Sequence, residues 1–451
     1  MITNSGAVAR VRPYLLASAA GIGLLVGGVA QAAIADGPVD TARRLDPAEA
    51  GLEAQGGTDA LRITSVENVR HSTDVIFDRT QLQDVPTNGA PIPANATVED
   101  VRQIVISQPG TPTTARDTGP SLNGIGQMII STPNPDGSVG LGLCTGSLIN
   151  PRTVLFAAHC VNTRPATAYG SGSGGVAIGF GFNASNNTSL PGGTSTPLLN
   201  WLFGSVAAGR APNLTSTAEN FYTVNAVAYN PLSLAPAAQG FLFGDIAIAS
   251  LDTPAANIPT WAILLSALPA PTSITAANGT GYHVALSGYG RNGIGNVGDT
   301  GAIDFRRRVA ENWLGALTSF NTRDTAIFGG FTVDRPQNLY WLDFDDPRRG
   351  TASATVFDFN LFRDNALPNE GTTAGGDSGG PLILDRTFAR QIAIGVLSGG
   401  SRFFAGSPFS TYGTASFYQP IYLYWDWIAA NNPYRYVGAV AGDGNWADPS
   451  R

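Results

Sequence analysis

Short apolar runs separated by turn residues dominate the chain from about residue 124 onward. Runs of this length bounded by Gly, Pro, Asn and Ser are typical of β-strands. We expect strands at Ile125–Ile130, Gly146–Ile149, Val154–Ala158, Val284–Leu286, Ile392–Leu397 and Phe417–Ile421. The Gly-, Ser- and Asn-rich stretch Gly170–Gly193 predicts a surface loop, and Ile421–Ala430 predicts a short terminal helix. The pattern as a whole indicates an all-β fold.

The start of the chain has the pattern of an export signal. Arg10 and Arg12 precede the uncharged run Leu15–Val29, and Ala30-Gln31-Ala32 supplies small residues at the spacing that a signal peptidase needs. We predict a signal peptide over residues 1–32. A second cleavage site would end at Ala35, and the alternative is a retained membrane anchor, although the run is short for a span and contains several glycines.

Residues 33–120 are rich in Asp, Thr, Pro and Gly, with short periodic pieces at Ala60–Ile63 and Val101–Ile106. Such a composition favours a propeptide or an N-terminal spacer with a little structure.

The composition excludes several classes of protein. The chain has 451 residues, 43% of them hydrophobic and only 13% charged, with 55 Gly and 30 Pro, which is typical of loop-rich β-proteins. A net charge of −7 argues against nucleic acid as a partner, because phosphates require a basic surface. The chain has no lysine, so a Ser–Lys mechanism is excluded. Beyond the first 32 residues, no stretch is long and apolar enough to span a bilayer.

The chain has two cysteines, Cys144 and Cys160. In an exported protein such a pair usually forms a disulfide, and closing a loop of this size would stabilise the fold by about 3 kcal/mol. The alternative is two separate buried thiols. A structural role for both argues against a cysteine peptidase.

Three segments carry candidate chemistry. His159 lies beside Cys160, where a crosslink would hold a general base in place. Asp245 begins an apolar strand, and a buried carboxylate needs a partner such as an imidazole N–H. Ser378 lies in the glycine-rich run 375–381, where the backbone N–H groups of Gly376 and Ser378 would stabilise an oxyanion by about 3–4 kcal/mol each. Taken alone, each has a plainer interpretation, as a structural histidine, a turn aspartate and a flexible glycine loop.

Together these segments resemble the chymotrypsin-like serine peptidases over about residues 124–430. The run TGSLINPRTVLFAAHC resembles the family's histidine block, GDIAIASL its aspartate strand and GGDSGGP its nucleophile loop. SGYG at 287–290 and VLSGG at 396–400 resemble two further family segments, and the order His, Asp, Ser also agrees.

The resemblance implies a mechanism. Ser378 would attack the scissile carbonyl, His159 would transfer the proton, and Asp245 would orient the imidazole. Gly376 and Ser378 would form the oxyanion hole. The expected substrate-binding residues are Thr372 in the specificity pocket and Ser398, Gly399 and Gly400 along the peptide, with Ser398 also supporting Asp245. We expect no metal and no cofactor.

The implied fold is two six-stranded antiparallel barrels, with a short helix at the C-terminal end. Residues 121–270 would form the first barrel with His159 and Asp245, residues 271–430 the second with Ser378, and residues 431–451 a tail. The expected partners are protein or peptide substrates, without nucleic acid and without stable membrane insertion of the mature chain.

The sequence departs from the family at three points. Thr372 is not acidic, so we expect cleavage after small or apolar residues rather than after Arg or Lys, and we expect nearby Glu370 to point elsewhere. The second disulfide that braces the pocket in animal members is missing. No Ile-Val-Gly-Gly-type start follows an arginine, since Arg116 is followed by Asp117, so the means of activation is open.

Two other functions remain as alternatives. One is an inactive binding module on the same fold, and the other is a surface protein whose peptidase domain mainly processes itself. The tail segment Gly442–Pro449 resembles the start of the β-solenoid stalk of bacterial autotransporters, which would add an outer-membrane barrel as a partner; a disordered tail is the alternative. The protein is expected to be exported, to the periplasm or the extracellular space, or to the cell surface if it is an autotransporter.

Overall fold

The structure is a computed structural model. It describes residues 65–70, 104–107, 110, 114–117, 119–135, 139–170, 175–188, 196–206, 208–268, 280–299, 303–362, 364–404 and 406–432, together with the backbone of 73–77. The expected signal peptide (1–32), the pieces at Ala60–Ile63 and the tail segment Gly442–Pro449 lie outside the described residues.

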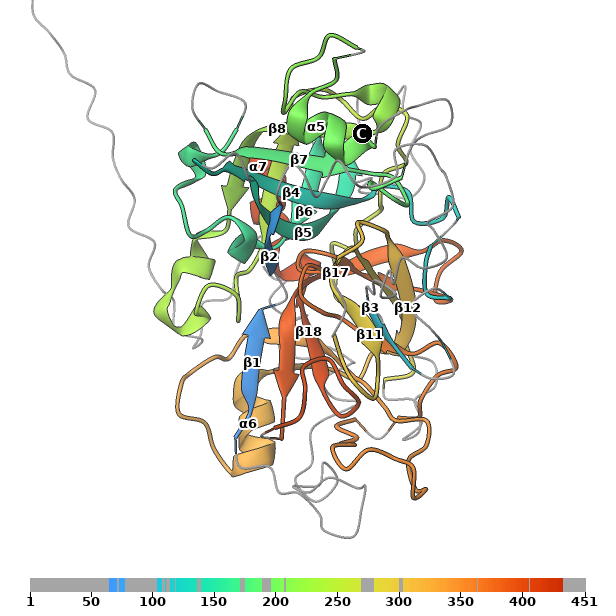
Figure 1. Ribbon diagram of the computed structural model, residues 1–451. Coiled ribbons are helices and arrows are strands. Elements are labelled where there is room, and N and C mark those ends of the chain that lie inside the picture. The colour runs from blue at the N-terminus through green and yellow to red at the C-terminus, as the bar shows by residue number, and fades with distance from the viewer. Residues whose placement is uncertain are drawn as a thin grey trace, which may run out of the picture.

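One sheet closes into a six-stranded antiparallel barrel (Figure 1). Around the barrel the strands are β5 (Val139–Asn150), β4 (Ile125–Pro133), β7 (Ala177–Gly181), β8 (Phe221–Tyr229), β9 (Ala247–Leu251) and β6 (Thr153–Phe156). The pairing of β6 with the second half of β5 closes the ring. The first half of β5 pairs instead with β2 (Thr73–Phe77). The apolar faces of these strands point inward, where Met128, Phe156 and Phe180 are fully buried.

A second antiparallel sheet carries the rest of the chain. Its strands are, in order, β12 (Arg308–Trp313), β10 (His283–Gly288), β16 (Pro381–Leu384), β17 (Ile392–Arg402), β18 (Ala415–Pro420), β14 (Asn338–Asp343) and β13 (Ala316–Ser319). β1 (Glu67–Arg70) also pairs with β17. The pairings among the described residues leave β12 and β13 as its two ends. The two sheets lie one above the other (Figure 1).

A small three-stranded sheet joins distant parts of the chain. β3 (Ile104–Ile106) lies between β11 (Asn292–Ile294), to which it is parallel, and β15 (Gly371–Thr372), to which it is antiparallel. Strand β3 is completely or almost completely buried. The region 33–120, expected to be a propeptide or spacer with a little structure, contributes β1, β2 and β3 in its described parts, and each of these strands pairs with a strand of the main body.

The α-helices in the described part of the chain are short. They are α5 (Pro197–Phe203), α6 (Phe320–Phe328) and α7 (Trp425–Asn431), and the 3-10 turn η7 (Ile421–Tyr424) leads directly into α7. The expected helix at Ile421–Ala430 is therefore present as a 3-10 turn followed by two turns of α-helix. Ile428 of α7 belongs to the same buried cluster as Ile149 and Ile246, and Asn432 hydrogen-bonds to Asn150 and Thr153, so the C-terminal end of the described chain lies against the barrel.

The expectation that Gly170–Gly193 is only a loop was wrong, because it contains the barrel strand β7. This strand carries glycines where strands usually carry branched residues. A side chain at Gly179 would lie 2.6 Å from the Trp201 ring, and one at Gly181 would lie 2.4 Å from Asn186. The glycines are therefore required by neighbouring side chains that the local pattern does not reveal.

Candidate active site

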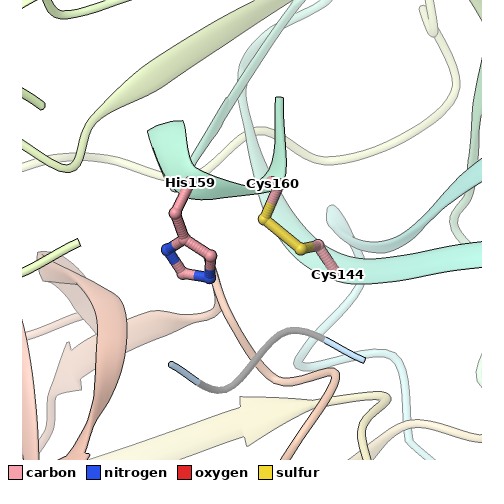
Figure 2. A group of neighbouring side chains, drawn as sticks. All are labelled: Cys144, His159 and Cys160. Carbon is pink, nitrogen blue, oxygen red and sulfur yellow. A yellow bond between two sulfur atoms is a disulfide. The ribbon is translucent and has the colours of Figure 1, made fainter. Parts of the chain in front are cut away.

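His159 lies on a short turn that follows strand β6 of the barrel. The turn is the 3-10 helix η1 (Ala158–Cys160), and a disulfide joins its last residue to Cys144 of β5. Figure 2 shows the imidazole beside this disulfide, pointing away from the sulfur atoms. The expected Cys144–Cys160 pair is thus present, and because both sulfurs are bonded, they cannot act as metal-binding thiolates.

Asp245 holds His159 with both of its carboxylate oxygens. The Oδ2 atom lies 2.7 Å from His159 Nδ1, and Oδ1 accepts a hydrogen bond of 2.7 Å from the His159 backbone N–H. Asp245 is completely buried at the start of strand β9. A carboxylate in this position assigns the proton to Nδ1 and leaves Nε2 free to accept a proton.

Ser378 completes the line of contacts from the other sheet. Its Oγ lies 2.7 Å from His159 Nε2, and the residue is fully buried. The loop is fixed to both sheets, because the N–H of Thr145 in β5 donates to the Ser378 carbonyl at 2.7 Å and Gly379 N–H donates to Leu397 O in β17 at 2.8 Å. The fold therefore brings together the three residues predicted as catalytic, from positions up to 219 residues apart.

Gly376, two residues before Ser378, carries one of the two N–H groups predicted for the oxyanion hole. Gly376 has a φ of +102°, which favours glycine, and its carbonyl accepts a hydrogen bond from Thr145 Oγ1 at 3.1 Å. Within the described ranges, neither the Gly376 N–H nor the Ser378 N–H donates to a protein acceptor. Both donors predicted for the oxyanion hole are thus without an acceptor in the described part of the chain.

Asp377, the residue before Ser378, is buried and bound to backbone N–H groups. Its Oδ1 accepts from Gly290 N at 2.7 Å, and its Oδ2 accepts from Ala374 N at 2.9 Å. Burial raises the pKa of this carboxyl to about 7, against the opposing effect of those two hydrogen bonds. The nucleophile loop is therefore braced by internal N–H donors.

Ser398, expected to support Asp245, is hydrogen-bonded to Gln419. Its Oγ accepts a hydrogen bond of 3.0 Å from Gln419 Nε2, while Gln419 Oε1 accepts one of 2.7 Å from the Tyr424 hydroxyl. Tyr424 in turn accepts from the N–H of Gly244 at 2.9 Å. Ser398 is thus linked to Gly244, the residue before Asp245, through the side chains of Gln419 and Tyr424.

The other residues predicted to bind substrate are buried. Gly399 and Gly400 pair with strand β1 of the same chain. Thr372 is 3% exposed, and its Oγ1 lies 2.9 Å from Ser416 Oγ. Glu370 points elsewhere as expected, since its two carboxylate oxygens accept from the N–H groups of Asp345 and Leu367.

The sequence did not predict the residues whose hydrogen bonds support the candidate catalytic residues. Gln419 and Tyr424 lie in none of the quoted motifs, Thr145 lies at the edge of the histidine block, and the roles of all three come from long-range contacts. The ring of Phe241 also lies edge-on to His159, with 6.1 Å between the ring centroids. Several buried carboxylates also lie near Glu370. The sequence feature that could have pointed to them is the acidic run Asp343-Phe344-Asp345-Asp346.

No protein-family model and no curated protein matches this chain. Among the helices of the described residues, none has the length and apolar character to cross a membrane.

Proposed function

We propose that this chain is an exported serine endopeptidase that cleaves peptide bonds through an acyl-enzyme. The observation that carries the proposal is the continuous contact from Asp245 to His159 to Ser378, with 2.7 Å at each side-chain step. A nucleophile, a base and an orienting carboxylate at such distances are the requirement for acyl transfer.

The reaction uses these residues in turn. Ser378 Oγ adds to the substrate carbonyl while His159 Nε2 takes its proton, and the N–H groups of Gly376 and Ser378 stabilise the oxyanion. His159 then gives the proton to the leaving amine, and the acyl-enzyme remains as an ester. Water hydrolyses the ester by the same route, with Asp245 stabilising the imidazolium in both steps.

The resemblance to chymotrypsin-like peptidases also suggests a second barrel around Ser378. The two ends of the second sheet, β12 and β13, are separated only by Leu314 and Gly315. Leu314 N–H donates to Tyr282 on one side, and Gly315 N–H donates to Trp341 on the other. The chain thus passes directly from one edge of the sheet to the other, which supports a barrel closed through this turn.

Export is proposed on two grounds. A disulfide such as Cys144–Cys160 is typical of oxidising compartments, and residues 1–32 have the sequence pattern of a signal peptide. The periplasm and the extracellular space both satisfy these observations.

Labelling with an active-site fluorophosphonate tests the proposal. Wild-type protein should be labelled at Ser378 and should hydrolyse casein, whereas Ser378→Ala should lose labelling and several orders of magnitude in rate. Ser353→Ala, which removes an exposed hydroxyl, is the matched control and should behave as wild type. Full hydrolysis by Ser378→Ala would refute the proposal, and a folded wild type without labelling or hydrolysis would favour the binding-module alternative.

A further inference from the structure

Strand β1 occupies the open edge of β17 beside Ser378. The pairing is antiparallel, with Val69 opposite Gly400 and Arg70 opposite Gly399. The β1 backbone lies directly on these glycines, because a Cβ at Gly399 would be only 2.1 Å from the carbonyl oxygen of Val69. The edge that was predicted to bind a peptide therefore already holds one, and it belongs to this chain.

Side chains fix β1 in this position. Asn68 Oδ1 accepts hydrogen bonds from Ser401 Oγ at 2.8 Å and from Arg323 Nη1 at 3.1 Å. Glu67 forms an ion pair with Arg402, and Val69 lines a small pocket together with Thr372. Specific partners for consecutive residues indicate one defined register rather than loose contact.

The next strand, β2, occupies the corresponding edge on the other side of Ser378. Thr73 pairs with Leu143 of β5, two residues before Thr145, whose N–H holds the Ser378 carbonyl. On the side where β1 pairs with β17, the carbonyl of Leu397 accepts a hydrogen bond from the Gly379 N–H. Figure 1 shows β1, in blue, pointing toward β2 at the boundary between the two sheets.

Only residues 71 and 72 separate the two strands in the sequence. The chain therefore leaves one edge beside the nucleophile loop at Arg70 and joins the other edge at Thr73. A segment that adds a strand to both edges is bound as an extended peptide is bound by strand addition. The two pairings thus place Arg70 and Thr73 on the two strand edges whose neighbouring residues, Leu397 and Thr145, hydrogen-bond to the nucleophile loop.

We propose that the segment Glu67–Phe77 is a substrate of its own chain and is cleaved between Arg70 and Thr73. This inference rests on the proposed function, since it requires Ser378 as the nucleophile. The amide C–N bond breaks as the ester to Ser378 Oγ forms, and the serine proton passes through His159 to the new amine. Water then supplies the hydroxyl that leaves the first fragment as a carboxylate and restores the Ser378 hydroxyl. Until this occurs, β1 and β2 exclude other peptides from the site.

Purified full-length wild type and Ser378→Ala should be compared by intact mass and N-terminal sequencing during incubation. Wild type should yield a new N-terminus at residue 72 or 73 with a rate independent of protein concentration, while Ser378→Ala stays intact. Hydrolysis of added peptide should rise as the cut proceeds. Protein that is labelled by fluorophosphonate and yet remains uncut at this segment would overturn the inference alone, whereas absence of labelling would overturn the proposed function.

A proline variant tests the register. Val69→Pro cannot donate from the backbone at the centre of β1, so cleavage between Arg70 and Thr73 should slow at least tenfold while labelling by fluorophosphonate becomes faster. Val206→Pro, at a fully exposed loop valine, is the matched control and should be cut as wild type. Thermal unfolding of both variants shows whether the fold is kept. Unchanged cleavage of folded Val69→Pro would overturn the register.

A different set of residues carries a second, independent inference. The carboxylates of Asp343, Asp345 and Asp364 are buried near the end of β14, with one oxygen of each within 4.8 Å of the others. Asp364 is 3% exposed, and among the described residues its carboxylate oxygens have no partner other than the neighbouring Asp343 carboxyl. Leaving such a carboxylate buried and unpaired is costly.

The basic side chain beside this acidic cluster is shared with a further carboxylate. Arg349 contacts Asp345 but also pairs with Asp358 at 2.7 Å. Asp343 Oδ2 accepts hydrogen bonds from the backbone N–H groups of Leu361 and Phe362. These bonds connect Asp343 to the segment that precedes Asp364. The side-chain nitrogen of Asn360 donates a hydrogen bond to the backbone carbonyl of Asp364. The side-chain oxygen of Asn360 is buried and has no hydrogen-bond partner among the described residues.

We infer that Asp343, Asp345 and Asp364 bind a divalent cation, with Ca²⁺ as the best fit. Ca²⁺ takes six to eight oxygen ligands, with carboxylates foremost, whereas a site of thiolate or imidazole would favour zinc. The bound ion would tie the loop at 360–364 to the end of β14.

Calorimetric titration of metal-free Ser378→Ala with CaCl₂ and thermal unfolding with CaCl₂ or EDTA test the site. Binding at one site, a higher Tm with Ca²⁺ and at least a tenfold weaker Kd in Asp364→Asn are expected. Asp426→Asn, at an exposed aspartate, is the control and should bind as the parent. Absence of binding by Ca²⁺, Mg²⁺ and Mn²⁺, together with a higher Tm in Asp364→Asn, would overturn the inference and indicate carboxyls that share protons.

Discussion

The Tyr424 hydroxyl accepts a hydrogen bond of 2.9 Å from the backbone N–H of Gly244, a residue 180 positions away in the sequence. Tyr424 ends the turn before α7, and Gly244 precedes Asp245. The same hydroxyl donates to Gln419, which in turn donates to Ser398. The C-terminal end of the described chain therefore supports the carboxylate that orients His159.

Tyr424→Phe should lower the free energy of unfolding by about 1–3 kcal/mol, because it leaves the buried Gly244 N–H without its acceptor. A lower kcat with nearly unchanged KM is expected as well, since Asp245 loses support without loss of a substrate contact. Urea unfolding and steady-state kinetics measure the two effects. Tyr229→Phe, which removes an exposed hydrogen bond to Arg164 O, is the matched control and should show neither.

Asp245→Asn should lower kcat by about 10⁴-fold while leaving the fold intact. The amide cannot stabilise an imidazolium, and it favours the tautomer in which Nε2 carries the proton. The measurement is peptide hydrolysis with burst-phase kinetics. A loss smaller than tenfold would show that Asp245 does not orient His159 during the reaction.

Replacing both cysteines by serine should lower the free energy of unfolding by about 3 kcal/mol, because the crosslinked residues are 16 positions apart. The crosslink also fixes the turn that carries His159, so kcat should fall as well. Guanidinium unfolding of the Ser378→Ala background avoids self-digestion. Equal midpoints with and without the disulfide would contradict the expectation.

The stability of the protein should depend on pH through Asp377. Its pKa is raised by burial to about 7, so the folded state binds a proton that the unfolded state releases near pH 4. This contribution is complete below about pH 4 and is lost as the pH rises to about 7, by at most about 4 kcal/mol. Asp299, with a pKa raised by burial to about 6, acts in the same direction. Urea unfolding between pH 4 and 8 should give a shallower decline for Asp377→Asn than for the parent.

Peptide-library profiling should show cleavage after small or apolar residues. Thr372 is uncharged and bonded to Ser416, and the Glu370 oxygens are bound to backbone N–H groups, so neither offers a counter-ion to a basic side chain. Burial of an unpaired cation is costly. A dominant preference for Arg or Lys would contradict this prediction.

The sequence by itself was sufficient for the elements with strong local patterns. The six expected strands lie on β4, β5, β6, β10, β17 and β18, and the disulfide is present. Strand β7 could not be predicted in this way, because its glycines are explained by Trp201 and Asn186 from other segments.

The sequence also singled out His159, Asp245 and Ser378, since each lies in a short run whose residue types restrict the backbone around it. Only the tertiary structure decided which groups support them. Hydrogen bonds such as those from Gly244 to Tyr424 and from Gln419 to Ser398 join residues far apart in the chain, and no local pattern encodes them. The placement of β1 and β2 on either side of Ser378 is of the same kind, because strand pairing depends on which edges the rest of the fold leaves open.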